Sequence, residues 1–527
     1  MADLKRLQTE LAQGTLSRRN FIAFALASGA TMATATMMAD KAKAATTGGT
    51  LRIGASGGNT VDNFDGATHA DFFMQLMGMG VIFDCLTEVA PDGSLRGELA
   101  ESWEASADAA TWTFRLREAE FHNGKSFGAD DVIESLVHHS GEDSKSAAKP
   151  LVSPISEMKK LDDRTVRITL AQGNADFPYL MSDYHLLMYP AGMKDEAIAK
   201  GIGTGGYVLE DFDPGVRGLA KKNPNDYRSD RVMFDSLEVI GINDSASRIN
   251  ALVTGEVDVI NKIEPKAVRL LARNNNIFIS EVTGNQHYTF PMHTNVAPFD
   301  NNDVRMAIKF GINRAEMVQK ILSGHGAVGN DHPIGPANQF FYSDLEQREF
   351  DPDRAKFHLK QAGLDSLSID LSAADAAFPG AVDAAQLFQQ TAKESNIDIN
   401  VIREPNDGYW SNVWTKKPFC ACYWSGRPTE DWMFNTAYER GVPWNDTFWD
   451  HERFNKLLFE ARVELDQAKR GEIYREMQVI VRDEAGTVVP MYANYIDAAS
   501  TKLAKPDVVS NAWQMDGCRI AERWSFS

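Results

Sequence analysis

The sequence predicts a mixed α/β protein, because segments with the two-residue period of strands alternate with segments of helical spacing along the chain. Trp112, Phe114 and Leu116 alternate with polar residues, as expected for a half-buried strand. Without the N-terminal 44 residues, which we predict below to be removed, about 483 residues remain, a length that corresponds to about three domain-sized units. No Pro-rich linker, low-complexity stretch or repeat of fixed period separates such units, so we expect them to share strands.

The individual elements follow from the same two periods. Strands are predicted at 50–53, 112–116, 166–170 and 207–209, and helices at 131–137, 303–310, 353–362, 455–465 and 470–483. Gly363 follows the third of these helices directly, and we expect it to end that helix because glycine tolerates a positive φ.

The N-terminal segment has the pattern of an export signal. Arg18 and Arg19 precede a weakly apolar run rich in Ala, Gly and Thr, and Ala42-Lys43-Ala44 has the small-x-small pattern of a cleavage site. The paired arginines resemble the twin-arginine signal, which implies export of a folded protein. We predict that residues 1–44 are a signal peptide cleaved after Ala44 and that the mature protein is periplasmic. A retained anchor is the alternative, because the run at 21–39 is almost long enough to span a bilayer.

The mature chain is expected to be strongly acidic. The signal segment carries three more basic than acidic residues, so its removal takes the net charge from −19 to −22. This charge repels phosphate backbones and anionic lipids, which argues against binding of nucleic acid or of a membrane surface. No second apolar run is long enough to span a bilayer, so we expect the mature chain to be soluble.

The cysteines and histidines do not form the pattern of a metal site. Cys85, Cys420, Cys422 and Cys518 are too few and too scattered for a disulfide scaffold, and the Cys-x-Cys pair lacks a second pair of ligands. We expect small buried residues, with one disulfide as an alternative whose partners the sequence does not choose. The eleven histidines contain no His-Glu-x-x-His. We therefore predict no metal and no cofactor.

Two motifs match catalytic patterns in an unsuitable context. Residues 54–58 fit the G-x-S-x-G nucleophile elbow around Ser56, but the segment that follows at 59–63 is loop-like instead of helical. Residues 201–206 fit the dinucleotide pattern G-x-G-x-x-G, but a strand follows them, so no helix N-terminus can hold a pyrophosphate. We predict that the protein is not an enzyme, and a periplasmic serine hydrolase that uses Ser56 is the alternative from another class.

A series of short blocks in fixed order carries a family resemblance. These blocks include ELAESWE (98–104), TWTFRLR (111–117), FHNGK (121–125), GTGGY (203–207), NPNDY (223–227) and DPDRA (351–355). In this order they resemble the family 5 extracytoplasmic solute-binding proteins, the dipeptide-, oligopeptide- and nickel-type receptors of ABC importers. The resemblance extends over nearly the whole mature chain.

This resemblance implies a two-lobed periplasmic binding protein fold of type II, with an enlarged first lobe and a hinge. The implied boundaries are 48–286 plus 493–527 for lobe one, with an extra subdomain at about 85–200, and 287–492 for lobe two. Two connecting segments, 283–290 and 489–494, would form the hinge, and contacts to the ligand would drive closure. The resemblance also implies that the receptor is a monomer. Its implied partners are a small peptide-like solute and the permease and ATPase subunits of an ABC importer.

The residues 410–449 hold six of the ten tryptophans and one departure from the family pattern. In peptide-binding members a Trp-x-x-Asp element lines the cleft, and its aspartate pairs with the ligand's α-ammonium group. Trp424 and Arg427 align with that element, so a cation replaces the anion. A buried arginine repels an ammonium group. Either Arg427 receives a carboxylate or phosphate of the ligand, or Glu430 or Asp431 neutralises it inside the protein.

Eight residues are candidates for ligand binding. Trp410 and Trp424 are predicted as cleft walls, with Tyr423 and Trp432 behind them and Arg427 as the charged group; Asn59, Phe64 and Asp65 are the candidates at the other cleft edge. The glycines of the loop at 57–65 would let its backbone approach a ligand, and Asp62 or Asp65 would hold a cation. We predict a receptor for a peptide-like or amino-acid-conjugate solute. The alternative is an anionic non-peptide solute, such as an opine, a sugar conjugate or a metal chelate.

Overall fold

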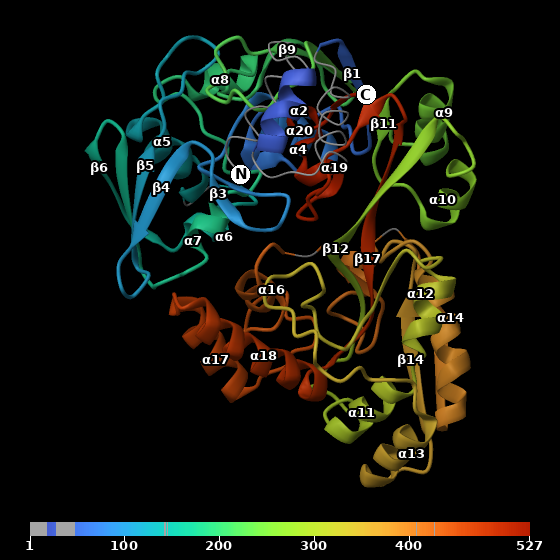
Figure 1. Cartoon of the computed structure of the whole chain (residues 1–527). Coiled ribbons are helices and arrows are strands. Elements are labelled where there is room, and N and C mark those ends of the chain that lie inside the picture. Colours follow the sequence, from blue (N-terminus) through green and yellow to red (C-terminus); the bar gives the residue numbers. More distant parts are fainter. Residues whose placement is uncertain (1–17, 28–47, 142–143, 145, 407, 426) are drawn as a thin grey trace.

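The computed structural model describes residues 18–27, 48–141, 144, 146–406, 408–425 and 427–527. It shows a mixed α/β protein with two lobes, the upper and lower halves of Figure 1. Two long antiparallel strands, β12 (Ile277–Pro291) and β17 (Thr487–Ser500), run from one lobe into the other. The predicted fold class is confirmed.

Within the described residues, a nine-stranded sheet runs through the first lobe and continues into the second. Its order is β16-β12-β17-β11-β1-β10-β9-β8, and β13 pairs with β17. The remaining bounds are β1 (Thr50–Ala55), β8 (Tyr207–Asp213), β9 (Arg217–Lys222), β10 (Ser236–Gly241), β11 (Val259–Ile260), β13 (Gly326–Val328) and β16 (Cys422–Trp424). β1 and β10 are parallel with Ile53 opposite Val239, and both side chains are fully buried, as expected for central parallel strands.

Short helices and strand pairs complete this part of the first lobe. They are the 3-10 helix η1 (Gly66–Thr68), α4 (Phe72–Met77), the π-helix η2 (Gly78–Ile82), β2 (Thr87–Val89), β3 (Leu95–Gly97), α8 (Lys194–Lys200), α9 (Ser245–Thr254), α10 (Pro265–Leu271), β18 (Leu503–Ala504), α19 (Gln514–Gly517), α20 (Ile520–Arg523) and β19 (Ser525–Phe526). The C-terminal segment therefore returns to the first lobe after β17, as Figure 1 shows.

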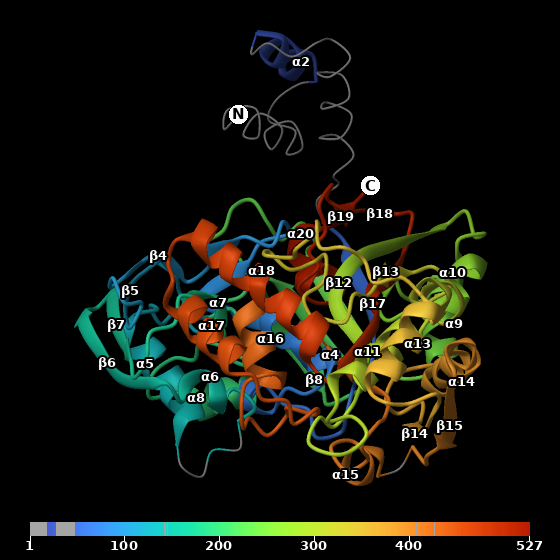
Figure 2. The same cartoon turned by 90° about the horizontal axis from the view of Figure 1, so that it is seen from below.

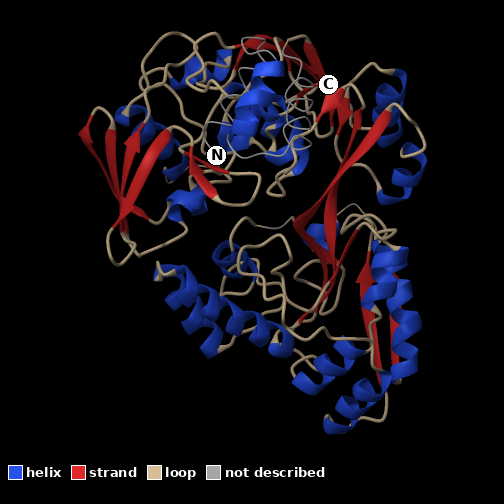
Figure 3. Cartoon of the chain, viewed as in Figure 1, coloured by secondary structure: helices blue, strands red, loops and turns tan. Residues whose placement is uncertain are grey.

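A second sheet lies at one end of the first lobe (Figure 3). Its antiparallel order is β4-β5-β7-β6. The bounds are β4 (Ala100–Ala105), β5 (Thr111–Leu116), β6 (Ile155–Asp162) and β7 (Thr165–Leu170), with helices α5 (Ala129–Ser140), α6 (Lys149–Val152) and α7 (Phe177–Leu180). Trp112 and Phe114 alternate with more exposed residues on β5, and they form a core with Val132 and Leu136 of α5. The apolar side of β5, which the two-residue period of the sequence predicts, thus packs against helix α5.

The second lobe combines a parallel strand pair with helices. Its elements are α11 (Asn302–Phe310), α12 (Arg314–Lys320), α13 (Pro352–Gln361), β14 (Leu367–Ala373), α14 (Ala381–Ala392), η3 (Lys393–Ser395), β15 (Ile397–Arg403), α15 (Tyr409–Asn412), α16 (Glu430–Ala437), α17 (Glu452–Val463) and α18 (Gln467–Glu484). α14 connects the parallel strands β14 and β15, and α17 and α18 pack along each other (Figure 2).

The apolar cores of the two lobes separate where β12 and β17 cross between them. Tyr288 and Met491 belong to the core of the second lobe, whereas Ile277 and Ile496 belong to a core of the first. The pairing of β12 with β17 shifts register between Thr283 and Gln286. A local irregularity bends and twists a strand. The strand pair is therefore interrupted at the passage from one lobe to the other.

The predicted strands and helices are confirmed, including the end of α13, where Gly363 has a φ of +79°. The four cysteines are free and buried, as expected. Gly201 ends α8 at a φ of +63° and β8 follows, so the dinucleotide pattern indeed lacks a helix after it.

The predicted signal peptide lies largely outside the described residues. α2 (Arg18–Ala27) contains the two arginines, whereas the predicted cleavage site at Ala44 falls outside the described part. None of the helices that the structure describes has both the length and the apolar composition that crossing a bilayer requires.

Candidate functional site

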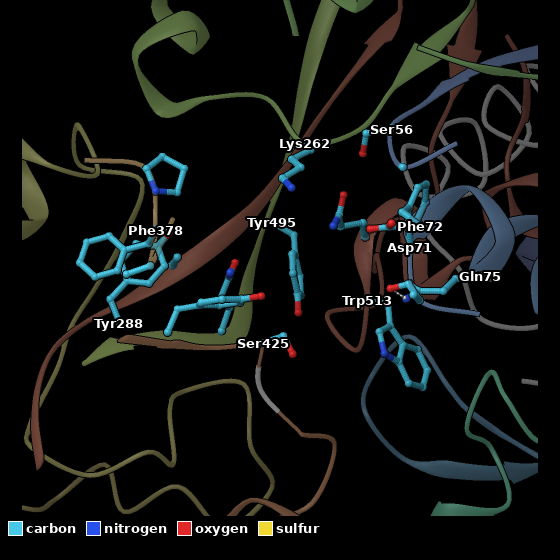
Figure 4. Close-up of a pocket in the computed structure, with 18 of the residues that line it drawn as sticks. Ser56, Asp71, Phe72, Gln75, Lys262, Tyr288, Phe378, Ser425, Tyr495 and Trp513 are labelled. Atoms are coloured by element: carbon cyan, nitrogen blue, oxygen red, sulfur yellow. Dashed lines mark hydrogen bonds between the residues drawn. The ribbon is translucent and has the colours of Figure 1, made fainter. Parts of the chain in front are cut away.

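A cavity of about 1780 Å³ lies between the lobes, and both contribute to its walls. Its lining includes Ser56, Asp71, Asp183, Tyr184 and Trp513 from the first lobe and Phe378, Tyr423, Arg427, Trp432 and Trp444 from the second. Tyr288 and Tyr495 reach it from the joining strands. In Figure 4, the Tyr495 ring stands between Lys262 and Ser425, while Tyr288 and Phe378 lie together on the opposite side from Trp513.

Arg427 lines this cavity three residues before the start of α16, and its backbone is hydrogen-bonded to the joining strand β12. Its carbonyl oxygen accepts hydrogen bonds from the side-chain amides of Asn285, at 2.9 Å, and Asn338, at 3.3 Å. Its guanidinium group donates to the Ser425 hydroxyl at 3.3 Å and lies 5.8 Å from the centre of the Trp432 ring. A cation over an indole face is an attractive arrangement. The charge is therefore held in a defined position.

A carboxylate of the first lobe acts on the charge of Arg427. Burial lowers the pKa of Arg427, and the nearby Tyr184 and Asp183 side chains oppose this shift. Burial raises the pKa of Asp183, but the charges of His185 and Arg427 and the hydrogen bonds from His185 outweigh it, so the pKa of Asp183 is lowered overall. The cavity thus holds a cation from one lobe and an ionised carboxylate from the other.

Glu430 and Asp431, which we considered as internal partners of Arg427, have other partners. Glu430 accepts a hydrogen bond from the Phe340 backbone amide at 2.8 Å, and burial raises its pKa to about 7. Asp431 accepts one from the Arg462 guanidinium at 3.0 Å, and burial raises its pKa to about 6. The structure therefore contradicts the hypothesis that either residue neutralises Arg427.

The positions of Tyr423 and Trp424 are the reverse of those predicted, in which Trp424 is the cleft wall and Tyr423 lies behind it. Trp424 is only 5% exposed and packs in the core, and it does not line the cavity, whereas Tyr423 does. The reason is the alternation of β16, whose pairing puts Tyr423 opposite Tyr288 and Trp424 opposite the buried His287. Tyr423 is thus a wall residue and Trp424 a core residue.

The other two aromatic candidates also change places. Trp432, predicted behind the wall, lines the cavity beneath Arg427. Trp410, predicted as a wall, lies outside the lining with its ring edge-on to Tyr423 at 5.6 Å. Trp410 therefore supports the wall from behind.

The three candidates at the other cleft edge do not reach the cavity. Phe64 is buried in the core of the first lobe, where its ring lies 4.7 Å from that of Phe212. Asp65 contacts His138 at 2.7 Å and caps η1. The Asn59 backbone amide donates to Asp62 in a turn. The polar groups of Asn59 and Asp65 form contacts within the first lobe. Of the loop at 57–65 only Gly57 lines the cavity, next to Ser56.

Several lining residues were not predicted. Tyr288 stacks on Phe378 with ring centres 4.1 Å apart and ring planes at 5°, and the Tyr495 hydroxyl donates to Asn285 at 3.3 Å. Tyr288 lies inside the predicted hinge segment and Tyr495 directly follows the other one. Aromatic residues in segments that join two lobes are the signal that could have identified both.

Ser56 lines the cavity without the contacts of a nucleophile. Its hydroxyl accepts a hydrogen bond from the Asn261 amide at 2.9 Å, and among the described residues no histidine or carboxylate is bonded to it. In the described part of the chain, no three His, Cys, Asp or Glu side chains are grouped as metal ligands. Aromatic walls with a few placed charges suit the binding of a small molecule.

Comparisons with known proteins agree with this geometry. The family model of bacterial extracellular solute-binding proteins, family 5, matches residues 94–446. The dipeptide-binding protein of Escherichia coli (strain K12) is 27% identical over 455 residues, which cover 76% of this chain and 81% of that protein. Heme-binding protein A of Haemophilus influenzae is 24% identical over 441 residues, which cover 73% and 77%.

Solved structures show the same fold. HbpA2 from Haemophilus parasuis has a TM-score of 0.80 at 19% identity, covering 91% of this chain and 100% of that one. AgaA from A. tumefaciens R10, in complex with agropinic acid, has a TM-score of 0.73 at 21% identity, covering 91% and 99%. Because the family model matches more than half of the sequence, the chain belongs to family 5 of the bacterial extracellular solute-binding proteins.

Proposed function

We propose that this protein captures a peptide-like or amino-acid-conjugate solute between its lobes and delivers it, chemically unchanged, to a membrane permease. The observation that carries the proposal is the cavity between the lobes, with Arg427 on one wall and Asp183 on the other. A zwitterionic solute would bring an anion to the first residue and a cation to the second. Closure of the lobes would then be driven by contacts that form only in the closed state.

The relatives support a peptide-like solute. Besides the dipeptide-binding protein of Escherichia coli, di/tripeptide-binding protein 1 of Pseudomonas aeruginosa is 26% identical over 443 residues, which cover 76% of this chain and 82% of that protein. Peptides carry both charges that the cavity complements. The guanidinium of Arg427 would donate two parallel hydrogen bonds to the solute's carboxylate.

A second candidate is an anionic solute that is not a peptide. Arg427 favours it, because peptide-binding members of this family, as the sequence resemblance implies, have an aspartate at this position. The AgaA structure, which has the same fold, was solved with agropinic acid. An opine, a sugar conjugate or a metal chelate would each supply an anion to Arg427.

The protein would be exported from the cytoplasm and would act as the receptor of an ABC importer. Residues 1–44 would serve as a twin-arginine signal peptide, and the mature monomer would act in the periplasm with permease and ATPase subunits. Lobe one would comprise 48–286 and 493–527, lobe two 287–492, and the register shift in β12 would lie in the hinge. The role is that of a receptor and not of an enzyme.

Mass spectrometry of the solute released from the purified mature protein tests this proposal. We expect a small molecule with a carboxylate, and titration calorimetry should then separate dipeptides and tripeptides from non-peptide carboxylates. A released solute without an anionic group would contradict the role of Arg427. A solute that the protein converts into another compound would contradict the receptor function.

A further inference from the structure

Two aromatic side chains of the second lobe line the cavity, and each is more than a third exposed. Tyr423 is 38% exposed and Trp444 49% exposed, and both line the cavity. We infer that these two residues, the aromatic shelf, bind an aromatic group of the solute. The inference rests on the proposed function and specifies the part of the solute that Arg427 does not contact.

Further aromatic rings hold the shelf from behind. Trp410 lies 5.6 Å from Tyr423, and Trp414 and Trp424 each lie 6.1 Å from Trp444. Trp410 and Trp414 are themselves 5.8 Å apart, so the rings form one connected group. Such edge-on and tilted contacts are favourable at these separations. The shelf is therefore supported before any solute binds.

Polar contacts fix the supporting group in turn. The Trp414 indole donates a hydrogen bond to the buried Asp446 carboxylate at 3.1 Å. The neighbouring Asn445 amide donates to the carbonyl oxygens of Trp449, at 2.8 Å, and Glu439, at 3.2 Å. These bonds anchor the loop on both sides of Trp444. A ring mounted in this way loses little conformational freedom on binding, which favours affinity.

The charge and the shelf belong to the same lobe and line the same cavity, and together they define a class of solute. Tyr423 and Arg427 are four positions apart, and Trp432 beneath Arg427 adds another ring to the lining. On the neighbouring strand, Tyr288 lies opposite Tyr423 and is covered by Phe378, whereas Tyr423 and Trp444 are each more than a third exposed. The geometry points to an anion that also carries an aromatic ring.

Two matched pairs of probes test this inference by calorimetry. The first pair is N-acetyl-tryptophan and N-acetyl-alanine, and the second is Ala-Trp and Ala-Ala. Each pair keeps the carboxylate and changes only the ring. We expect the tryptophan member of at least one pair to bind roughly 10- to 100-fold more tightly, because burying a ring removes a large apolar surface from water.

Variants of the shelf identify where the preference arises. Trp444→Ala should reduce the ratio of the two affinities to within about threefold of unity, while Trp444→Phe should keep most of it. The matched control is Phe448→Ala, because Phe448 is 46% exposed on the same loop but lies outside the cavity lining. This control should leave the ratio unchanged. Circular dichroism and thermal unfolding verify that each variant is folded.

Three results would overturn the inference. They are equal affinities within both pairs, no binding of either tryptophan probe, and a ratio that Trp444→Ala leaves intact. Failure of the proposed function gives a different result, because Arg427→Ala would then leave every affinity unchanged. If the proposed function holds, Arg427→Ala weakens both members of a pair and preserves their ratio.

Discussion

The Asp176 carboxylate of the first lobe and the Arg470 guanidinium of α18 in the second form an ion pair of 2.6 Å, with both side chains 3% exposed. Beside it, the Ala175 backbone amide donates to the carbonyl oxygen of Arg462 at 2.7 Å. The lobes therefore meet at a second point, away from β12 and β17. Removing one charge of a buried pair leaves the other charge uncompensated, so the arrangement of the lobes in this structure depends on both residues.

Asp176→Asn should shift the protein towards an open arrangement. The substitution leaves the Arg470 charge buried without its carboxylate, which costs about 1–3 kcal/mol in the closed state. We expect a larger radius of gyration by small-angle X-ray scattering and weaker solute binding by calorimetry. The control is Arg453→Ala, which removes an exposed pair with Glu476 within the second lobe and should change neither. Unaltered scattering and affinity in Asp176→Asn would show that the pair does not hold the lobes together.

Arg427→Ala should weaken the binding of an anionic solute by about 2–5 kcal/mol, because a buried charge would lose its partner. The measurement is calorimetry with the solute that copurifies. Arg440→Ala serves as control, since Arg440 pairs with Asp450 at an exposed site of the same lobe and should not affect binding. An affinity that Arg427→Ala does not change would remove this residue from the site.

Much of the fold was predictable because most elements are long enough to show a period. β5 alternates over six residues, and α11 repeats its apolar face over nine. β16 has only three residues, so its own sequence does not tell which side chains face the cavity. Pairing with β12 sets that choice by putting Tyr423 beside Tyr288. The exchange of Tyr423 and Trp424 is a consequence of this long-range pairing.

The sequence predicts the cation of the site, Arg427, but not the carboxylate of Asp183 on the other lobe. Arg427 stands out because, as the sequence resemblance implies, it takes the place of an aspartate. Asp183 is separated from it by more than two hundred positions, and only the folded chain brings their charges together. Glu430 and Asp431 are close in sequence but lie on a helix that directs them to Phe340 and Arg462. Closeness along the chain therefore does not tell which carboxylate acts on Arg427.

Trp424→Ala should affect stability more than binding. The side chain is buried among Trp414, Trp444 and Phe434, so its removal leaves a large cavity in the core. We expect a loss of about 3–5 kcal/mol in the free energy of unfolding, measured by chemical denaturation. Tyr423→Ala, its exposed neighbour on β16, should cost much less stability and should weaken binding of a ring-bearing solute. The reverse pattern would contradict the orientation of this strand.

Asp446→Asn should change how stability depends on pH. Burial raises the pKa of Asp446 to about 6 from an ordinary value of 3.8, against the hydrogen bonds from Trp414 and Cys422. As the pH rises through this range, the unfolded chain releases the proton first, so the wild type loses stability between about pH 4 and pH 6 and little more above it. The asparagine variant keeps a hydrogen-bond acceptor for the Trp414 indole, but its side chain does not titrate. Relative to the variant, the unfolding free energy of the wild type should therefore fall by about 2 kcal/mol from pH 4 to pH 7 in urea titrations. If the unfolding free energy of the wild type, relative to that of the variant, stays constant or rises with pH, then this carboxylate is not held in an apolar core.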